Sequence, residues 1–186
     1  SIRRELNGVS YVAGKGTDAT AEALRSITDW EKGRKYSFAE LEMAARAADA
    51  GVSTVDVNEQ RFMNPDSMIA EVVAAANEEG RAPSTVGELM QCVYKSLAEC
   101  YADAIRNLSE ITGKSYTSIN IVGGGTQEEQ LSQFAATACG RPVYAGPVEA
   151  TAIGNLAGQM IAGGELKDLA DARNCIFESF EIKIYQ

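Results

Sequence analysis

The chain has 186 residues, 45% of them hydrophobic, and its 26 acidic and 17 basic residues give a net charge of −9. This length allows one globular domain with a real core, or one module of a larger protein. The basic residues are scattered, which argues against nucleic acid and anionic membranes as partners. No apolar run reaches about 18 residues, so we expect no membrane-spanning helix. The polar opening residues predict no signal peptide.

Two residue types narrow the possible chemistry. The chain has no histidine, which excludes Ser-His-Asp catalysis, Cys-His catalysis and a histidine-based zinc site within these residues. The four cysteines, Cys92, Cys100, Cys139 and Cys175, form no CxxC pair. On a helix, the first two would lie about 12 Å apart, too far for a disulfide. We interpret all four as small buried hydrophobic residues in a reducing cytoplasm.

The first half of the chain begins with its weakest pattern. Residues 8–20 contain three glycines and could form a turn between a short strand and a helix over 20–30. Ser37 and Glu40 then have the spacing of a capping box, and Gly51 is the expected end of that helix. Residues 52–57, VSTVDV, alternate like a short strand.

Two helices are expected next. Residues 64–67, NPDS, have turn chemistry and predict the start of a helix that stops at Gly80. Residues 84–113 have the most regular pattern of the chain, with Ser84 or Thr85 as the cap. Their apolar positions recur every three or four residues, which favours a long helix with one face on the core. These positions are Leu89, Val93, Leu97, Cys100, Tyr101, Ala104, Leu108 and Ile111.

Strand and helix patterns alternate in the rest of the chain. This alternation predicts an α/β domain whose sheet is at least partly parallel. The predicted elements are a strand over 118–122, a helix over 127–139, a strand over 142–146, helices over 146–163 and about 168–178, and a strand over 180–185.

The first of these strands runs directly into three glycines. Gly123, Gly124 and Gly125 are followed by Thr126 and Gln127, and then by the predicted helix. A turn without Cβ atoms lets a ligand lie on the backbone, and the N-terminus of a helix favours negative charge. This stretch therefore has the properties of a nucleotide or phosphate platform. The alternative is a tight turn that needs positive φ angles and binds nothing.

Two common nucleotide motifs are absent. The GKS at residues 113–115 follows a predicted helix, and Leu108 stands where a Walker loop needs glycine, so Gly113 is interpreted as a helix C-cap. The glycine run does not complete GxGxxG, because Glu128 occupies the last position of that motif. The sequence therefore supports neither a Walker loop nor a Rossmann fold.

Three motifs occur in a fixed order along the chain: RFMNP at residues 61–65, IVGGG at 121–125, and AGPVEAT at 145–151 with GN at 154–155. Together they resemble the C-terminal domain of the FGGY family of carbohydrate kinases, and within it the kinases of L-rhamnulose. Their order and spacing agree with that family over roughly residues 56–165. A weaker match extends back to about Trp30.

This resemblance implies an actin-like ATPase (ribonuclease H-like) fold, with a mixed sheet flanked by helices and one long core helix. Two domains of such a kinase close over a cleft. Residues 37–186 would be the nucleotide-side C-terminal domain, residues 1–36 a poorly matched segment, and the N-terminal domain would be absent. The intact enzyme would use ATP and Mg²⁺ to phosphorylate a ketose, with L-rhamnulose expected first and L-fuculose or xylulose as alternatives.

The resemblance also assigns roles to residues. It places the adenosine end of ATP on the glycine turn, with Gly124 as the most direct contact and Thr126 and Gln127 beside it. Glu128 departs from the family, which often has an asparagine near the adenine at this position. A carboxylate cannot donate the hydrogen bonds that the asparagine amide donates. Catalytic groups and most sugar contacts belong to the absent domain, so no catalytic residue or metal ligand is assigned here and the isolated chain should be inactive.

Two other segments are interpreted as structural. In the stretch GPVEATAIGN, small residues at helical spacing indicate close packing against a neighbour, with Glu149 favouring the helix N-terminus. Arg61 and Asn64 are expected to order a loop. Two competing functions stay open for the whole chain: a non-catalytic nucleotide-binding or regulatory module with the actin-like fold, and an actin-like assembly domain.

Overall fold

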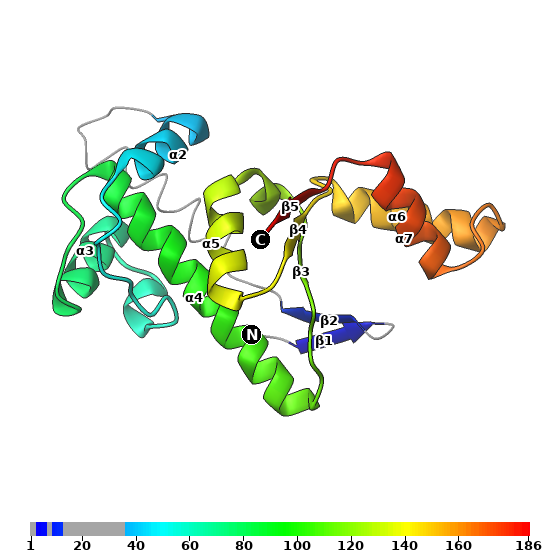
Figure 1. Cartoon of the computed structure of the whole chain (residues 1–186), viewed down its shortest axis with the longest axis horizontal. Helices are drawn as coiled ribbons and strands as arrows, with labels where there is room; N and C mark the ends of the chain where they lie inside the picture. The colour runs from blue at the N-terminus through cyan, green and yellow to red at the C-terminus, as the bar shows by residue number, and fades with distance from the viewer. Residues whose placement is uncertain (1–2, 7–8, 13–35) are drawn as a thin grey trace. The chain divides into compact units, whose positions relative to one another are not determined.

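The protein is described by a computed structural model that covers residues 3–6, 9–12 and 36–186 (Figure 1). The chain divides into two compact units, residues 1–114 and residues 115–186. Within the described residues, no helix is both long enough and apolar enough to cross a membrane. The helix expected over residues 20–30 lies outside the described part of the chain.

The first unit is built on one long helix. Helices α2 and α3 both contact α4, and the short 3₁₀ helix η1 contacts α3 (Figure 1). Strands β1 and β2 form an antiparallel pair in which Arg3 is opposite Val12. The elements are β1 (Arg3–Leu6), β2 (Val9–Val12), α2 (Phe38–Ala47), η1 (Gln60–Phe62), α3 (Met68–Glu78) and α4 (Val86–Thr112).

Close approach of α2 to α4 depends on Gly87. A Cβ atom on Gly87 would lie 2.3 Å from the carbonyl oxygen of Ala44, so a glycine is needed where the two helices meet. One turn further along α4, the Gln91 side-chain amide donates a hydrogen bond of 2.7 Å to the carbonyl of Ala45. The core of this unit therefore lies between α2, α3 and the N-terminal half of α4.

The capping signals are confirmed, but α2 ends earlier than expected. The Ser37 hydroxyl accepts from the Glu40 N–H, and the Glu40 carboxylate accepts from the Ser37 N–H. The helix ends at Ala47 instead of continuing to Gly51, because Ala48 is already extended. The Gly51 N–H then donates to the Asp49 side chain, so a local turn replaces the last helical turn that we expected.

The strand expected over residues 52–57 was a wrong prediction. Residues 52–56 have no regular secondary structure, Val57 begins a turn, and none of them belongs to either sheet. The Ser53 N–H donates to the Arg81 carbonyl, and the Val55 N–H donates to the Ser96 hydroxyl at 2.9 Å. The backbone is therefore paired with a loop and with a helix side chain. Val52 and Val55 are the buried side chains, at a spacing of three that no strand would give.

Burial along α4 differs between its two halves. The N-terminal half is buried on nearly all sides, including the predicted positions Leu89, Val93 and Leu97. At the other end Ile111 is 68% exposed, which corrects its assignment to the core. The helix ends as predicted at Gly113, which is left-handed with a φ of 65° and makes the GKS stretch a helix C-cap.

The second unit is an α/β arrangement with a mixed sheet. Its strand order is β3-β4-β5, where β3 and β4 are parallel and β5 is antiparallel to β4. Helix α5 packs on this sheet, and α6 and α7 pack on each other (Figure 1). The elements are β3 (Ile119–Ile121), η2 (Gly124–Gln127), α5 (Glu129–Cys139), β4 (Val143–Ala145), α6 (Ala150–Gly163), α7 (Leu169–Ser179) and β5 (Lys183–Tyr185). The alternation of strands and helices is confirmed.

The core of this second unit lies between α5 and β4. Leu131, Ala135 and Cys139 recur every four residues along α5 and are buried, as are Val143 and Ala145 of β4. This spacing places one face of α5 against the sheet.

The cysteine prediction holds for two of the four residues. Cys92 and Cys139 are buried, whereas Cys100 is half-buried and Cys175 is exposed. Cys175 lies on α7, where Ala172 is the buried residue among those described. The prediction failed there because α7 buries so little of its surface in this unit.

Candidate nucleotide-binding turn

The glycine run forms the connection between β3 and α5. Gly123 has a φ of +85°, a left-handed value that favours glycine, and residues 124–127 then form one 3₁₀ turn. Helix α5 begins after Glu128. The order of the elements is as predicted: a short strand, a glycine turn and a helix whose first N–H groups have no partner within the helix. The strand itself is half-buried to exposed, not buried as expected.

Hydrogen bonds fix the shape of this turn. The Gly123 N–H donates to the Pro147 carbonyl at 3.1 Å. The Gly123 carbonyl accepts from the Thr126 N–H at 3.1 Å and from the Thr126 hydroxyl at 2.8 Å. The Glu128 N–H donates to the Gly125 carbonyl at 3.3 Å. The ends of the turn are therefore tied down.

The predicted site residues differ in what they present to solvent. Gly124 and Gln127 are exposed, Gly123 and Gly125 are half-buried, and Thr126 is 7% exposed. A Cβ atom on Gly124 would meet no atom within 4 Å outside its chain neighbours. The surface available to a ligand is therefore the backbone at Gly124 together with the Gln127 side chain.

Glu128 is the residue at which the sequence departs from the expected asparagine. It is 8% exposed. It precedes α5 but makes no side-chain capping hydrogen bond to that helix. The loss of the family's amide hydrogen bonds to adenine at this position stays a prediction.

The structure brings two of the three sequence motifs together. The Gly146 N–H donates to the Ile121 carbonyl at 2.9 Å, and the Pro147 carbonyl accepts from Gly123. The AGPVEAT stretch at the end of β4 therefore lies directly beside the glycine turn at the end of β3. Sequence reasoning missed this contact, although the parallel pairing of adjacent strands was the signal that could have indicated it.

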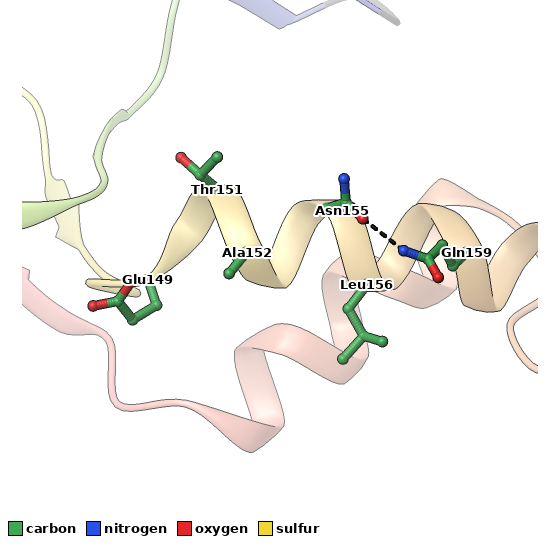
Figure 2. A pocket seen from close by; sticks show the side chains of 6 residues that line it. All are labelled: Glu149, Thr151, Ala152, Asn155, Leu156 and Gln159. Atoms are coloured by element: carbon green, nitrogen blue, oxygen red, sulfur yellow. Dashed lines mark hydrogen bonds between the residues drawn. The ribbon is translucent and has the colours of Figure 1, made fainter.

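Residues of α6 and its N-cap Glu149 line a pocket of about 580 Å³, shown in Figure 2. Thr151 and Asn155 point to one side of the helix and Leu156 to the opposite side (Figure 2). The Asn155 side-chain oxygen accepts from Gln159 at 2.7 Å. The lining residues are Glu149, Thr151, Ala152, Asn155, Leu156 and Gln159, so none of the glycine turn takes part.

Close packing of α6 was expected from its small residues and is observed at one of them. Ala157 is buried at 9% exposure, while Ala152 and Gly154 are exposed. The difference arises because α7 is the helix that α6 packs on within this unit, and it covers one side of α6.

Arg61 orders its loop, as predicted. Its guanidinium forms two parallel hydrogen bonds, of 2.9 and 2.8 Å, with the Glu78 carboxylate, and another of 2.9 Å with Glu59. The hydrogen bonds with Arg61 lower the pKa of Glu78, and those with Glu78 raise the pKa of Arg61. The loop of the RFMNP motif is therefore attached to the end of α3. Within the described residues, no group of three or more Cys, Asp or Glu could hold a metal ion.

The fold and its motifs define a class of protein. The family model for "FGGY family of carbohydrate kinases, C-terminal domain" matches residues 7–163, more than half of the chain. The chain therefore belongs to the FGGY family of carbohydrate kinases, and the resemblance seen in its motifs is confirmed.

Three curated proteins that are similar to this chain share the name rhamnulokinase. The chain is similar to the rhamnulokinase of Halalkalibacterium halodurans, with 43% identity over 152 residues that cover 81% of this chain and 32% of the relative. It is 44% identical to the rhamnulokinase of Enterococcus faecalis over 155 residues, 82% of this chain and 31% of the relative. The rhamnulokinase of Bacillus subtilis is 42% identical over 185 residues, 95% of this chain and 38% of the relative. The chain spans about a third of the length of the curated relatives it matches.

Proposed function

We propose that this chain is most of the nucleotide-side C-terminal domain of an ATP-dependent ketose kinase with the actin-like fold. The domain proper would comprise residues 37–186, preceded by a less characteristic segment over 1–36. A second domain, outside these residues, would supply the catalytic base and most sugar contacts. The single observation that carries the proposal is the exposed glycine turn between a parallel strand and a helix in a chain of the FGGY family.

The turn would bind the adenosine end of ATP or ADP through its backbone. Gly124 offers an open backbone surface, and Gln127 beside it offers a side chain that both donates and accepts hydrogen bonds. Gly123, Gly125 and Thr126 complete the binding segment. Mg²⁺ would be held mainly through the nucleotide phosphates and the other domain. When bound, it would neutralise charge that develops on the transferred phosphoryl group.

L-Rhamnulose is the sugar we propose, with the γ-phosphate transferred to its 1-hydroxyl. The support is that three relatives at 42–44% identity are named rhamnulokinase. Closure of the two domains would exclude water, so that ATP phosphorylates the sugar and is not hydrolysed. We propose that the kinase acts in the cytoplasm.

The test is made with the full-length kinase that contains this chain. ADP release would be followed with Mg-ATP and L-rhamnulose, L-fuculose, L-xylulose, D-xylulose or glycerol, with a no-sugar control. We expect the highest kcat/KM for L-rhamnulose. A preference for another ketose would keep the kinase proposal and replace its substrate. Absence of sugar-dependent ADP release with all five would overturn the kinase proposal and favour a non-catalytic nucleotide-binding module.

A further inference from the structure

The connection between β4 and α6 contacts the glycine turn through two backbone hydrogen bonds. One joins the Gly146 N–H to the Ile121 carbonyl at 2.9 Å, and the other joins the Gly123 N–H to the Pro147 carbonyl at 3.1 Å. They lie on either side of Val122, the residue between β3 and the glycine run. The path of the backbone into the glycine run is therefore set by the neighbouring connection.

Gly146 itself has no room for a side chain. Its φ is +137°, and a Cβ atom there would lie 2.7 Å from the carbonyl oxygen of Glu181 and 3.3 Å from the Cα of Ile182. Both atoms belong to the backbone that leads into β5, so they cannot rotate away as the end of a flexible side chain could. Gly146 is buried and fills a narrow space between Ile121 and the start of β5.

The buried residue Thr126 stabilises the same turn through two hydrogen bonds. Its N–H and its hydroxyl both donate to the Gly123 carbonyl, at 3.1 and 2.8 Å, and the residue is 7% exposed. Gly123 is thus fixed at its N–H by Pro147 and at its carbonyl by Thr126. The exposed peptide of Gly124 follows directly.

We propose that Gly146, Pro147 and Thr126 are positioning residues of the nucleotide site. They set the orientation of the Gly124 backbone, and the buried Thr126 does so through its two hydrogen bonds to the Gly123 carbonyl. The inference rests on the proposed function, because it assigns how the proposed nucleotide surface keeps its shape. Misplacement of the turn weakens nucleotide binding and leaves sugar binding, on the other domain, unchanged.

Two matched pairs of variants test this in the full-length kinase. Thr126→Val keeps the shape of the side chain and removes the hydroxyl, whereas Thr126→Ser keeps the hydroxyl. Gly146→Ala places a Cβ against Glu181, whereas Gly164, with a φ of +82°, also has a positive φ but no atom within 4 Å of an added Cβ, so Gly164→Ala is the control. ADP affinity would be measured by calorimetry, KM for ATP and for L-rhamnulose by kinetics, and amide exchange over residues 122–131 by mass spectrometry.

We expect Thr126→Val and Gly146→Ala to weaken ADP binding by about three- to tenfold, the range of one lost hydrogen bond. Both variants raise the KM for ATP, leave the KM for the sugar within about twofold, and speed amide exchange in the turn. Thr126→Ser and Gly164→Ala stay within about twofold of the wild type in ADP affinity. If Gly146→Ala does not fold, the Thr126 pair decides.

The outcomes separate this inference from the proposed function. Wild-type protein that binds no ADP overturns both. Wild-type protein that binds ADP, together with Thr126→Val that matches it in affinity and amide exchange, overturns the positioning role and leaves the nucleotide site standing. An equal loss of ADP affinity in Thr126→Ser and Thr126→Val would also contradict the inference. Serine keeps the hydroxyl, so the loss could not then come from the missing hydrogen bond.

Discussion

Single residues in the glycine turn have separable roles. Gly123 needs its glycine for conformation, since its φ of +85° would strain any side chain. Gly124 has no positive φ, and a Cβ there would point into open space. Substitution at Gly124 therefore changes the surface without disturbing the fold, which makes it the cleaner residue for testing a ligand contact.

We predict that Gly124→Val weakens ADP binding to the full-length kinase by at least about tenfold, because a branched side chain would cover the backbone surface. The melting temperature should stay close to that of the wild type. Calorimetric titration with ADP and a thermal melt give the two values. Gly163→Val is the matched control, because its Cβ would also meet open space, at the end of α6. Unchanged ADP affinity in Gly124→Val would show that nucleotide does not lie on this turn.

At the scale of whole elements, α4 has the most buried residues of the described helices, and several side chains form hydrogen bonds at its N-terminus. Thr85 caps the helix by accepting from the Glu88 N–H. The Glu88 carboxylate accepts from the Ser84 N–H at 2.8 Å and from the Ser84 hydroxyl at 2.6 Å, and Arg81 lies 3.0 Å from its other oxygen. Hydrogen bonds from Ser84, with a smaller contribution from Arg81, lower the pKa of Glu88 below its ordinary value of 4.5.

This lowered pKa predicts a pH-dependent contribution to stability. The charged Glu88 stabilises the fold above pH 4.5, and the contribution is lost as the pH falls through the lower pKa of the folded state. Glu88→Gln should therefore lower the free energy of unfolding at pH 7 by about 1–2 kcal/mol, and the difference should shrink below pH 4.5. Urea unfolding at pH 7, 5 and 3.5 measures it. Exposed Glu110→Gln, on the same helix, is the control, and an equal loss in both variants would contradict the assignment.

The packing of α2 on α4 gives a second prediction for this helix. Alanine normally stabilises a helix by about 0.5–1 kcal/mol relative to glycine. At Gly87 the added Cβ would meet the Ala44 carbonyl at 2.3 Å. Overpacking of this kind typically costs about 1–3 kcal/mol, so Gly87→Ala should lower the free energy of unfolding.

Gly158→Ala is the matched control for that change. This glycine is also inside a helix, and its Cβ would meet no atom within 4 Å. It should raise the free energy of unfolding slightly, by the helix propensity alone. Denaturant unfolding of the two variants gives the comparison, and a stabilised Gly87→Ala would refute the close approach of α2 to α4.

At the scale of the whole molecule, the chain spans about a third of the relatives it matches. Several large apolar side chains of its second unit are exposed, among them Leu156 at 58% and Phe177 at 53%. An exposed apolar side chain is common singly, but a group of them is a feature of surfaces that contact other protein.

A prediction about activity belongs to this scale. The isolated 186-residue chain should release ADP from Mg-ATP and L-rhamnulose at least about a hundredfold more slowly than the proposed full-length kinase, because we propose that the general base belongs to a second domain outside these residues. A coupled ADP assay at equal molar concentrations makes the comparison. Comparable rates would place the catalytic group within this chain and would contradict the division of roles we propose.

The sequence by itself determined the elements that depend on neighbouring residues. Capping by Ser37 and Glu40, the left-handed end of α4 at Gly113, and the strand–glycine–helix order around Gly123 all follow from groups within a few positions of one another. The FGGY family also followed from the sequence, because three motifs occur at the expected spacing.

Tertiary structure alone decided the rest. Residues 52–57 alternate like a strand, yet the N–H groups of Ser53 and Val55 donate to Arg81 and Ser96, far along the chain. The exposure of Ile111 and the contact of Pro147 with Gly123 likewise depend on distant partners. A local pattern fixes the conformations that a segment can adopt. Its burial and hydrogen bonding are fixed only when the remote groups that compete for its polar and apolar atoms are in place.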